Sequence, residues 1–133
     1  MSADPGGDLS NVTRYFNLIR SKDAGPFMLT IDLFFSDEDA RRAFVEAGVL
    51  SPERIGELYR VDPAQVQVFD MIDIGAMKIS FPRPVPSGEF GDTDITGGQQ
   101  SALLVDMIAE LDIVGEGPGL VVRDPVGPNT TII

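Results

Sequence analysis

The stretch from Phe81 to Gln100 constrains the fold most, because it consists mainly of residues that interrupt helices and strands. Three prolines alternate with Arg83 and Val85, and four glycines, two aspartates and two glutamines follow. Proline fixes φ and glycine permits positive φ, so this composition favours a loop of defined shape over a floppy linker. Loops of about twenty residues are uncommon inside a compact domain and usually serve binding or catalysis, or are disordered. The composition here favours binding.

Composition and charge exclude several classes of function. The chain has 133 residues, enough for one domain, and its 43% hydrophobic and 23% charged residues are typical of a globular protein. Its net charge of −11 disfavours non-specific binding to nucleic acid or to an anionic membrane. No apolar run approaches the roughly twenty residues that span a bilayer, and the first residues lack the pattern of a signal peptide. We therefore expect a cytoplasmic protein without nucleic-acid or membrane partners.

The chain contains neither histidine nor cysteine. This excludes disulfides, thiolate nucleophiles, a Ser-His-Asp triad within the chain, and metals held by thiolate or imidazole. Acid–base chemistry would depend on Asp, Glu, Lys or Tyr. A bound metal would need carboxylate and carbonyl ligands, which suit magnesium, calcium or manganese. Lysine is also scarce, since only Lys22 and Lys78 are present.

Apolar periodicity predicts elements in a definite order along the first half of the chain. Helical spacing of apolar residues predicts a helix over residues 8–19, followed by a turn over residues 20–26. Residues 27–35 alternate as a strand that is covered on one side. A helix is predicted from Ser36, as N-cap, to Gly48, as C-cap. Another begins with Ser51 as N-cap and Pro52 at its first position and ends before residues 61–63.

The second half of the chain adds two strands and one helix. Residues 66–71 and 76–81 are predicted to form an antiparallel hairpin around a turn at residues 73–75, and residues 100–112 an amphipathic helix. This order predicts an α+β domain with a small, mainly antiparallel sheet of three to four strands. Its helices pack on one face of the sheet, in a ferredoxin-like arrangement.

We place this single domain in residues 1–114. Residues 115–133 are rich in glycine and proline and show no periodicity, yet they are too apolar for a solvated tail. We predict that this segment is extended and lies on another surface, such as that of a partner chain. Disorder is the alternative.

Residues that could carry chemistry gather first in the predicted turn Arg20–Pro26. This turn combines Ser21 and Gly25 with two cations, and such a turn can hold a carboxylate or phosphate through backbone N–H groups and charge. A solvated surface turn is the alternative. A second cluster is Lys78 with Asp32, which would project to the same sheet face if their strands pair. A structural ion pair is the favoured interpretation there, and catalysis the alternative.

The third cluster lies in the proline- and glycine-rich loop itself. Arg83 is held between two prolines, and Asp92 and Asp94 flank a threonine in a glycine-rich context. We interpret this segment as an interaction or substrate-binding loop. Two carboxylates in such a loop can also hold a divalent cation, although the EF-hand spacing is absent. Alternatively, the aspartates cap the last helix, or the glutamines Gln99 and Gln100 bond across an interface. The glycines match no nucleotide-binding fingerprint.

Three blocks in this order resemble a family of small bacterial proteins that is classed as a domain of unknown function. The blocks are Arg20–Phe27, Arg83–Gly88, and Gly91–Ile95 with Gln99 and Gln100. The resemblance covers about residues 8–112. The same layout resembles the C-terminal ferredoxin-fold domain of acyclic terpene utilisation proteins, through the polar turn before the first strand and the element Ile74–Met77.

The resemblance implies a small subunit that is encoded separately from a larger partner subunit. It also implies a role in the catabolism of branched carboxylic acids or their coenzyme A esters, and the reaction we expect is that of a hydro-lyase, a hydratase or dehydratase. The chain would then complete a shared site for a carboxylate or acyl-CoA ligand at the interface. The expected catalytic residues are Lys22, Asp23, Arg83 and Asp92. The expected substrate-binding residues are Ser21, Gly25, Ser87, Gly88, Asp94 and Gln99.

No cofactor is specified by these patterns, and a divalent cation is retained only as the alternative at Asp92 and Asp94. Two other functions stay open. One is a non-catalytic structural or regulatory module that binds a larger subunit. The other is a self-sufficient small enzyme that uses Lys78 or Asp32.

Overall fold

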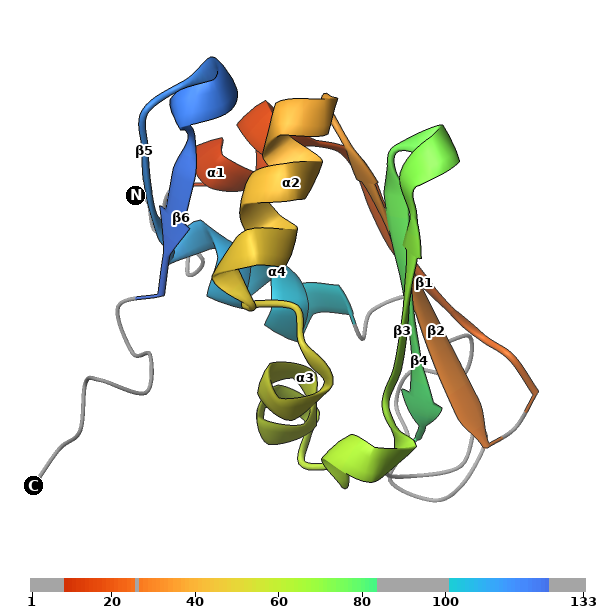
Figure 1. Cartoon of the computed structure of the whole chain (residues 1–133). Helices are drawn as coiled ribbons and strands as arrows, with labels where there is room; N and C mark the ends of the chain where they lie inside the picture. The colour runs from red at the N-terminus through yellow and green to blue at the C-terminus, as the bar shows by residue number, and fades with distance from the viewer. Residues whose placement is uncertain (1–8, 26, 84–100, 125–133) are drawn as a thin grey trace, which may run out of the picture.

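An antiparallel sheet of four strands forms the base of the structure, with the strands in the order β1-β2-β4-β3. The computed structural model describes residues 9–25, 27–83 and 101–124 (Figure 1). The strands are β1 (Phe16–Asp23), β2 (Met28–Phe35), β3 (Gln67–Met71) and β4 (Ala76–Pro82). Consecutive strands form the hairpins β1–β2 and β3–β4, and the pairing of β2 with β4 joins them.

The α-helices of the described chain all lie on one face of this sheet (Figure 1). They are α1 (Ser10–Tyr15), α2 (Glu38–Ala47), α3 (Pro52–Tyr59) and α4 (Ser101–Ala109). Short 3-10 helices occur at η1 (Pro63–Gln65), η2 (Ile72–Ile74) and η3 (Gly117–Gly119). The predicted α+β class, with helices over one face of an antiparallel sheet in a ferredoxin-like arrangement, is confirmed.

The core lies between the sheet and the helices. The inward-facing side chains of the central strand β2 are 5% exposed or less: Leu29, Ile31, Leu33 and Phe35. Phe44 of α2 is fully buried, and its ring centroid lies 4.9 Å from that of Phe16 and 5.7 Å from that of Phe35. These aromatic contacts fix α2 against the β1–β2 end of the sheet.

The first predicted helix, residues 8–19, is wrong over its last third. Only α1 is helical, and residues 16–23, which include part of the predicted turn, form the edge strand β1. The pairing register of β1 with β2 shifts between Phe16 and Leu18, as in a β-bulge. Because of this shift, Phe16 and Ile19 both face the helices. Their spacing of three residues therefore imitated the period of a helix.

The ends of α2 and α3 show which capping predictions hold. Gly48 ends α2 in the left-handed region, with φ of 73°, and the Ser51 hydroxyl accepts a hydrogen bond from the Arg54 N–H at the start of α3. Both caps are as predicted. The N-cap of α2, however, is Asp37 and not Ser36, because the Asp37 carboxylate accepts from the Ala40 N–H at 2.8 Å.

This difference is testable by alanine substitution. Asp37→Ala is expected to lower the free energy of unfolding by about 1 kcal/mol, the usual cost of losing an N-cap side chain. Ser36 is the neighbouring residue and is exposed, as Asp37 is. Ser36→Ala is expected to change the free energy of unfolding by less than about 0.5 kcal/mol. Urea denaturation of both variants measures the difference. Equal losses would mean that Asp37 does not act as the cap.

The chain after α4 returns to the domain as a second, small hairpin. β5 (Asp112–Val114) pairs with β6 (Val121–Arg123), so the predicted last helix is shorter than residues 100–112 and ends at Ala109. Leu120 and Val122 are each 5% exposed and belong to the main core. The Arg42 guanidinium donates to the carbonyl oxygens of Gly117 and Pro118, which holds the connection between β5 and β6 against α2.

The boundary predicted after Val114 therefore passes through this hairpin. Its end is held by an ion pair of 2.9 Å between Arg54 Nε and an Asp124 carboxylate oxygen. Residues 115–124 pack on this chain, while residues 125–133 lie outside the described residues. The prediction of a partner surface for the segment 115–133 stays a prediction.

Tyr59 gives the fold a predictable response to alkaline pH. Burial raises the pKa of its hydroxyl above the ordinary value, against the smaller opposing effect of a hydrogen bond with the Leu104 backbone. In the unfolded chain the Tyr59 hydroxyl loses its proton at about pH 10, whereas in the folded protein it is still protonated at that pH. The stability contributed by Tyr59 is thus fully present below about pH 10 and decreases as the pH rises above it.

Tyr59→Phe should remove this decrease. Between about pH 9 and about pH 11, the wild-type free energy of unfolding is expected to fall on the order of 1 kcal/mol more than that of the variant. Tyr15→Phe is the control, since Tyr15 is only partly buried. Urea titrations at the two pH values measure the effect, and parallel losses in wild type and Tyr59→Phe would contradict it.

Candidate functional site

Three of the predicted site residues meet at one end of the sheet, on its helix-covered side. Ser21 and Asp23 alternate along β1, and Arg83 directly follows β4. Arg83 Nη1 donates a hydrogen bond to Asp23 Oδ1, and Ser21 Oγ accepts one of 3.2 Å from the Ser101 N–H. Ser101 is the first residue of α4. We call these four residues the α4-end cluster.

The local backbone explains how these distant segments come together. The Arg83 N–H donates to the Phe27 carbonyl oxygen at 2.9 Å, which continues the β2–β4 pairing beyond the last strand residue. The β1–β2 turn folds back through Gly25, whose φ is 88°, a conformation that glycine adopts without strain. The turn places Asp23 beside Arg83, although the two residues are 60 positions apart in the sequence.

The α4-end cluster is largely excluded from water. The Arg83 side chain is 3% exposed and that of Asp23 is 19% exposed, while Ser21 as a residue is 7% exposed. Each of the three has at least one further polar or electrostatic interaction. A guanidinium attracts carboxylate and phosphate groups, and Asp23 holds that of Arg83 in place. The same pair could equally be structural, since buried ion pairs alone are weak evidence for catalysis.

Lys22 does not join this cluster. Successive side chains of a strand point to opposite faces, so Lys22 lies on the face away from Ser21 and Asp23. It stands opposite Thr30 of β2 on that face. Gly25 lies in the neighbouring turn. The other predicted site residues, Ser87, Gly88, Asp92, Asp94 and Gln99, fall outside the described residues, as do most of the predicted loop 81–100 and Gln100.

The second predicted cluster has the expected placement but a different ion pair. Asp32 and Lys78 stand directly opposite each other on β2 and β4, as predicted. The carboxylate of Asp32, however, pairs with Arg20 Nε at 3.4 Å. Arg20 is Asp32's neighbour on the other side, on the strand that sequence reasoning missed. Without β1 in the predicted sheet, this partner could not be foreseen.

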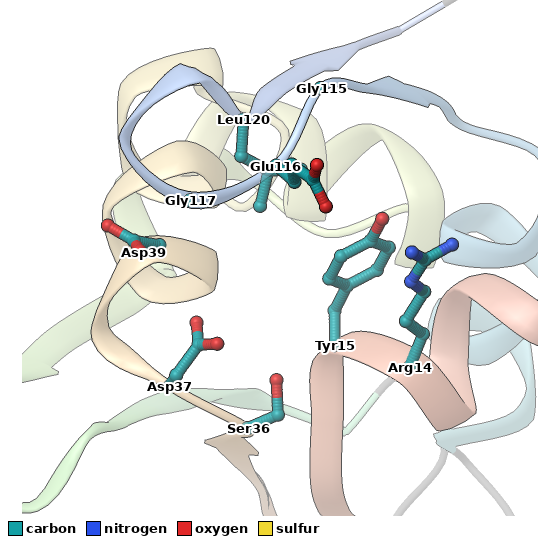
Figure 2. A pocket seen from close by; sticks show the side chains of 9 residues that line it. All are labelled: Arg14, Tyr15, Ser36, Asp37, Asp39, Gly115, Glu116, Gly117 and Leu120. Carbon is teal, nitrogen blue, oxygen red and sulfur yellow. The ribbon is translucent and has the colours of Figure 1, made fainter.

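One cavity was not foreseen at all. It has a volume of about 270 Å³ and lies where the α1–β1 junction, the start of α2 and the β5–β6 connection meet (Figure 2). Three carboxylates line it, from Asp37, Asp39 and Glu116, together with Arg14 and Tyr15. The Tyr15 hydroxyl points toward Glu116 across the opening (Figure 2). The only sequence signal for this cavity was the run of acidic residues at the start of α2.

Two of the charged side chains that line this cavity, Asp37 and Arg14, already interact with other groups of the chain. Asp37 caps α2, and the Arg14 guanidinium lies over the Tyr15 ring at 5.7 Å from its centroid. Within the described ranges, no group of three or more carboxylates is arranged to hold a metal ion. The cavity therefore offers an acidic recess without a metal site, and the α4-end cluster is the better candidate for chemistry.

Comparisons with known proteins place most of this chain in one family. A family model described as "Domain of unknown function (DUF4387)" matches residues 12–108, from within α1 almost to the end of α4. No curated protein and no solved structure matches the chain. None of the helices in the described residues has both the length and the apolar character needed to span a bilayer.

Proposed function

We propose that the chain, which belongs to the DUF4387 family, a domain of unknown function, acts as a small subunit that completes the active site of a larger protein. The observation that carries the proposal is the α4-end cluster. Two segments, β1 and the end of β4, bring Asp23 and Arg83 together, and Ser21 of β1 accepts a hydrogen bond from Ser101 at the start of α4. This arrangement suits recognition of a carboxylate or phosphate-bearing ligand at the end of the sheet.

The composition supports a shared site over a self-contained one. The chain lacks histidine and cysteine, so its own proton-transfer groups are limited to Asp, Glu, Lys and Tyr. Tyr59, whose pKa is raised by burial, packs its ring on Phe81 in the core, at 4.7 Å between centroids. Groups from a second protein would supply what this chain lacks.

For the reaction, we propose addition of water to, or its removal from, an unsaturated or branched carboxylic acid or its coenzyme A ester. This part rests on the resemblance to acyclic terpene utilisation proteins. In such a reaction a base removes a proton from water or from carbon, and an acid returns one to the other centre, so two opposed groups are needed. Asp23 is the proposed proton-transfer group of this chain, and Arg83 positions it and attracts the carboxylate.

The test uses the full chain co-expressed with a candidate larger subunit. The purified complex is expected to hydrate a panel of 2-enoyl acids and their coenzyme A esters. Hydration is measured as the loss of absorbance from the conjugated double bond. Neither protein alone should do so. Asp23→Asn should lower kcat/KM by about a hundredfold or more while the complex still assembles.

A matched control is Asp112→Asn, which also removes one carboxylate from an arginine pair. Asp112 on β5 and Arg123 on β6 are mostly exposed, and Arg123 Nη1 lies 3.9 Å from Asp112 Oδ2. This change should therefore leave activity unaltered. Turnover by the isolated chain would contradict the proposal and favour the self-sufficient enzyme. Full activity of the Asp23→Asn complex would remove Asp23 from the mechanism.

A non-catalytic structural or regulatory module is the second candidate. The observation that favours it is the burial of the Asp23–Arg83 pair, which is also what a purely structural contact would show. The two candidates differ in what Asp23→Asn does to the complex. Loss of activity with assembly retained supports the shared active site, whereas loss of assembly measured by size-exclusion chromatography supports the module.

A further inference from the structure

The sheet face opposite the helices is not covered by any element that the structure describes (Figure 1). We call it the open face. Its side chains follow from the pairing registers, since residues directly opposite each other in an antiparallel sheet point to the same side. An uncovered sheet face in a small α+β domain is normally polar, because water is its only neighbour. This one is not uniformly polar.

Cross-strand pairing arranges the open face in three rows that run across β1, β2, β4 and β3. The first row is apolar and consists of Leu18, Phe34, Ala76 and Met71. The second row is mainly charged and consists of Arg20, Asp32, Lys78 and Phe69. The third row is polar and consists of Lys22, Thr30, Ser80 and Gln67. The face thus has an apolar edge, a charged centre and a polar edge, and its exposed groups lie mainly on the outer strands, since Asp32 and Thr30 of β2 are 7% and 3% exposed.

Two large apolar side chains of the open face are exposed enough to need explanation. Leu18 of the apolar row is 46% exposed, and Phe69 of the charged row is 47% exposed, at opposite edges of the sheet, whereas Ala76 between them is buried. In the turn that continues the apolar row beyond Met71, Ile72 is 56% and Ile74 is 62% exposed. Large apolar side chains gathered along one face and its adjoining turn are typical of a surface that binds another protein.

The charge of the open face is opposite to that of the chain. Three cations, Arg20, Lys22 and Lys78, stand against the single carboxylate of Asp32, whereas the whole chain has a net charge of −11. Both lysines of the protein lie here, and neither forms an ion pair with a residue in the described ranges. Elsewhere most arginines are paired with carboxylates: Arg41, Arg42, Arg54, Arg83 and Arg123.

We propose that the open face is the docking surface for the larger subunit, and that the partner presents an acidic surface with an apolar margin. This inference rests on the proposed function, and it adds where the two proteins meet. Charge complementarity selects the partner's chemistry, because an excess of positive charge favours carboxylates opposite it. A second copy of this chain is disfavoured, since two open faces would bring like charges together.

The position of the open face also fits the shared site. Lys22 in the polar row is the strand neighbour of both Ser21 and Asp23, which point to the other side of β1. A partner seated on the open face therefore lies one strand's thickness from the α4-end cluster. It needs only to reach around the β1–β2 end of the sheet to contact that cluster.

The test begins with a photo-crosslinking residue introduced at Phe69 or at Val45 of the full chain, co-expressed with the larger subunit. Phe69 is on the open face, and Val45 is 39% exposed on α2, on the helix side. We expect the larger subunit to be crosslinked from position 69 and not from position 45. The crosslinked partner peptide should carry a net negative charge.

Affinity measurements with the purified subunits complete the test. Lys22→Glu should weaken binding of the larger subunit at least tenfold, and the affinity of the wild type should fall with added salt. Arg60→Glu is the matched control, because Arg60 is also exposed and its replacement changes the net charge equally. It should change the affinity less than twofold. Lys78→Gln provides a second variant that adds no negative charge beside Asp32.

The outcomes separate this inference from the proposed function. Crosslinking from position 45 but not from position 69, or equal effects of Lys22→Glu and Arg60→Glu, would overturn the docking surface and leave the shared active site standing. Crosslinking from position 69 to a second copy of this chain would also overturn it. If the larger subunit binds neither variant nor wild type, the proposed function itself fails, and the docking surface with it.

Discussion

Replacing Phe44 by alanine is expected to lower the free energy of unfolding by about 3–5 kcal/mol. Phe44 is fully buried, and its ring contacts those of Phe16 and Phe35, edge-on in the first case. Tyr15 lies at 6.4 Å between centroids on the same side. The substitution leaves a cavity where α2, β1 and β2 meet, and a closely packed core cannot fill it by small shifts. Urea denaturation at pH 7 measures the loss.

The control for this prediction is Phe69→Ala, which removes the same side chain from the open face. Phe69 is 47% exposed, so the free energy of unfolding should fall by less than about 1 kcal/mol. The variant should nevertheless bind the larger subunit more weakly, if the open face is the docking surface. Similar losses of stability in the two variants would show that Phe44 is not the centre of the aromatic core.

Replacing Arg83 by alanine is expected to lower the free energy of unfolding by about 3 kcal/mol, as in other buried ion pairs that lose one partner. The Arg83 side chain is 3% exposed, so the substitution removes a side chain that is almost entirely buried. Asp23, whose side chain is 19% exposed, loses its contact with the guanidinium. The cost is therefore mainly that of a carboxylate left without its guanidinium.

Two further variants separate this cost from general damage. In the double variant with Asp23→Ala, the carboxylate that has lost its contact with Arg83 is removed as well, so part of the lost stability should return. Arg123→Ala removes an arginine from an exposed pair and should cost less than about 0.5 kcal/mol. If the double variant loses as much free energy of unfolding as the two single variants together, Asp23 and Arg83 are not energetically coupled.

The sequence predicted those parts of the fold whose signal is local. β2 follows from apolar residues at every odd position, and the ends of α2 and α3 follow from Gly48 and from Ser51 before Pro52. β1 was missed because the register shift near Asn17 places Phe16 and Ile19 on one side and so imitates a helix. The β5–β6 hairpin was missed because strands of three residues have no detectable period. The two strands pair with each other, and β6 also packs against α2.

The candidate site was predicted in part for the same reason. Ser21, Asp23 and Arg83 were selected from residue types in two separate blocks, and the structure brings these three together. The prediction also grouped Lys22 with them, because a turn would allow neighbours to converge. In a strand, neighbours must point apart. The pairing of Asp32 with Arg20 could not be predicted without knowing that β1 exists.

The strand order also has a consequence for how quickly the chain folds. β1–β2 and β3–β4 join residues that are close in sequence, so each hairpin can form early and locally. The β2–β4 pairing joins Leu29 to Phe81 and must close a loop that contains both α2 and α3. Closing that loop costs more chain entropy than forming either hairpin. We therefore expect the alignment of the two hairpins along their central seam to limit the folding rate.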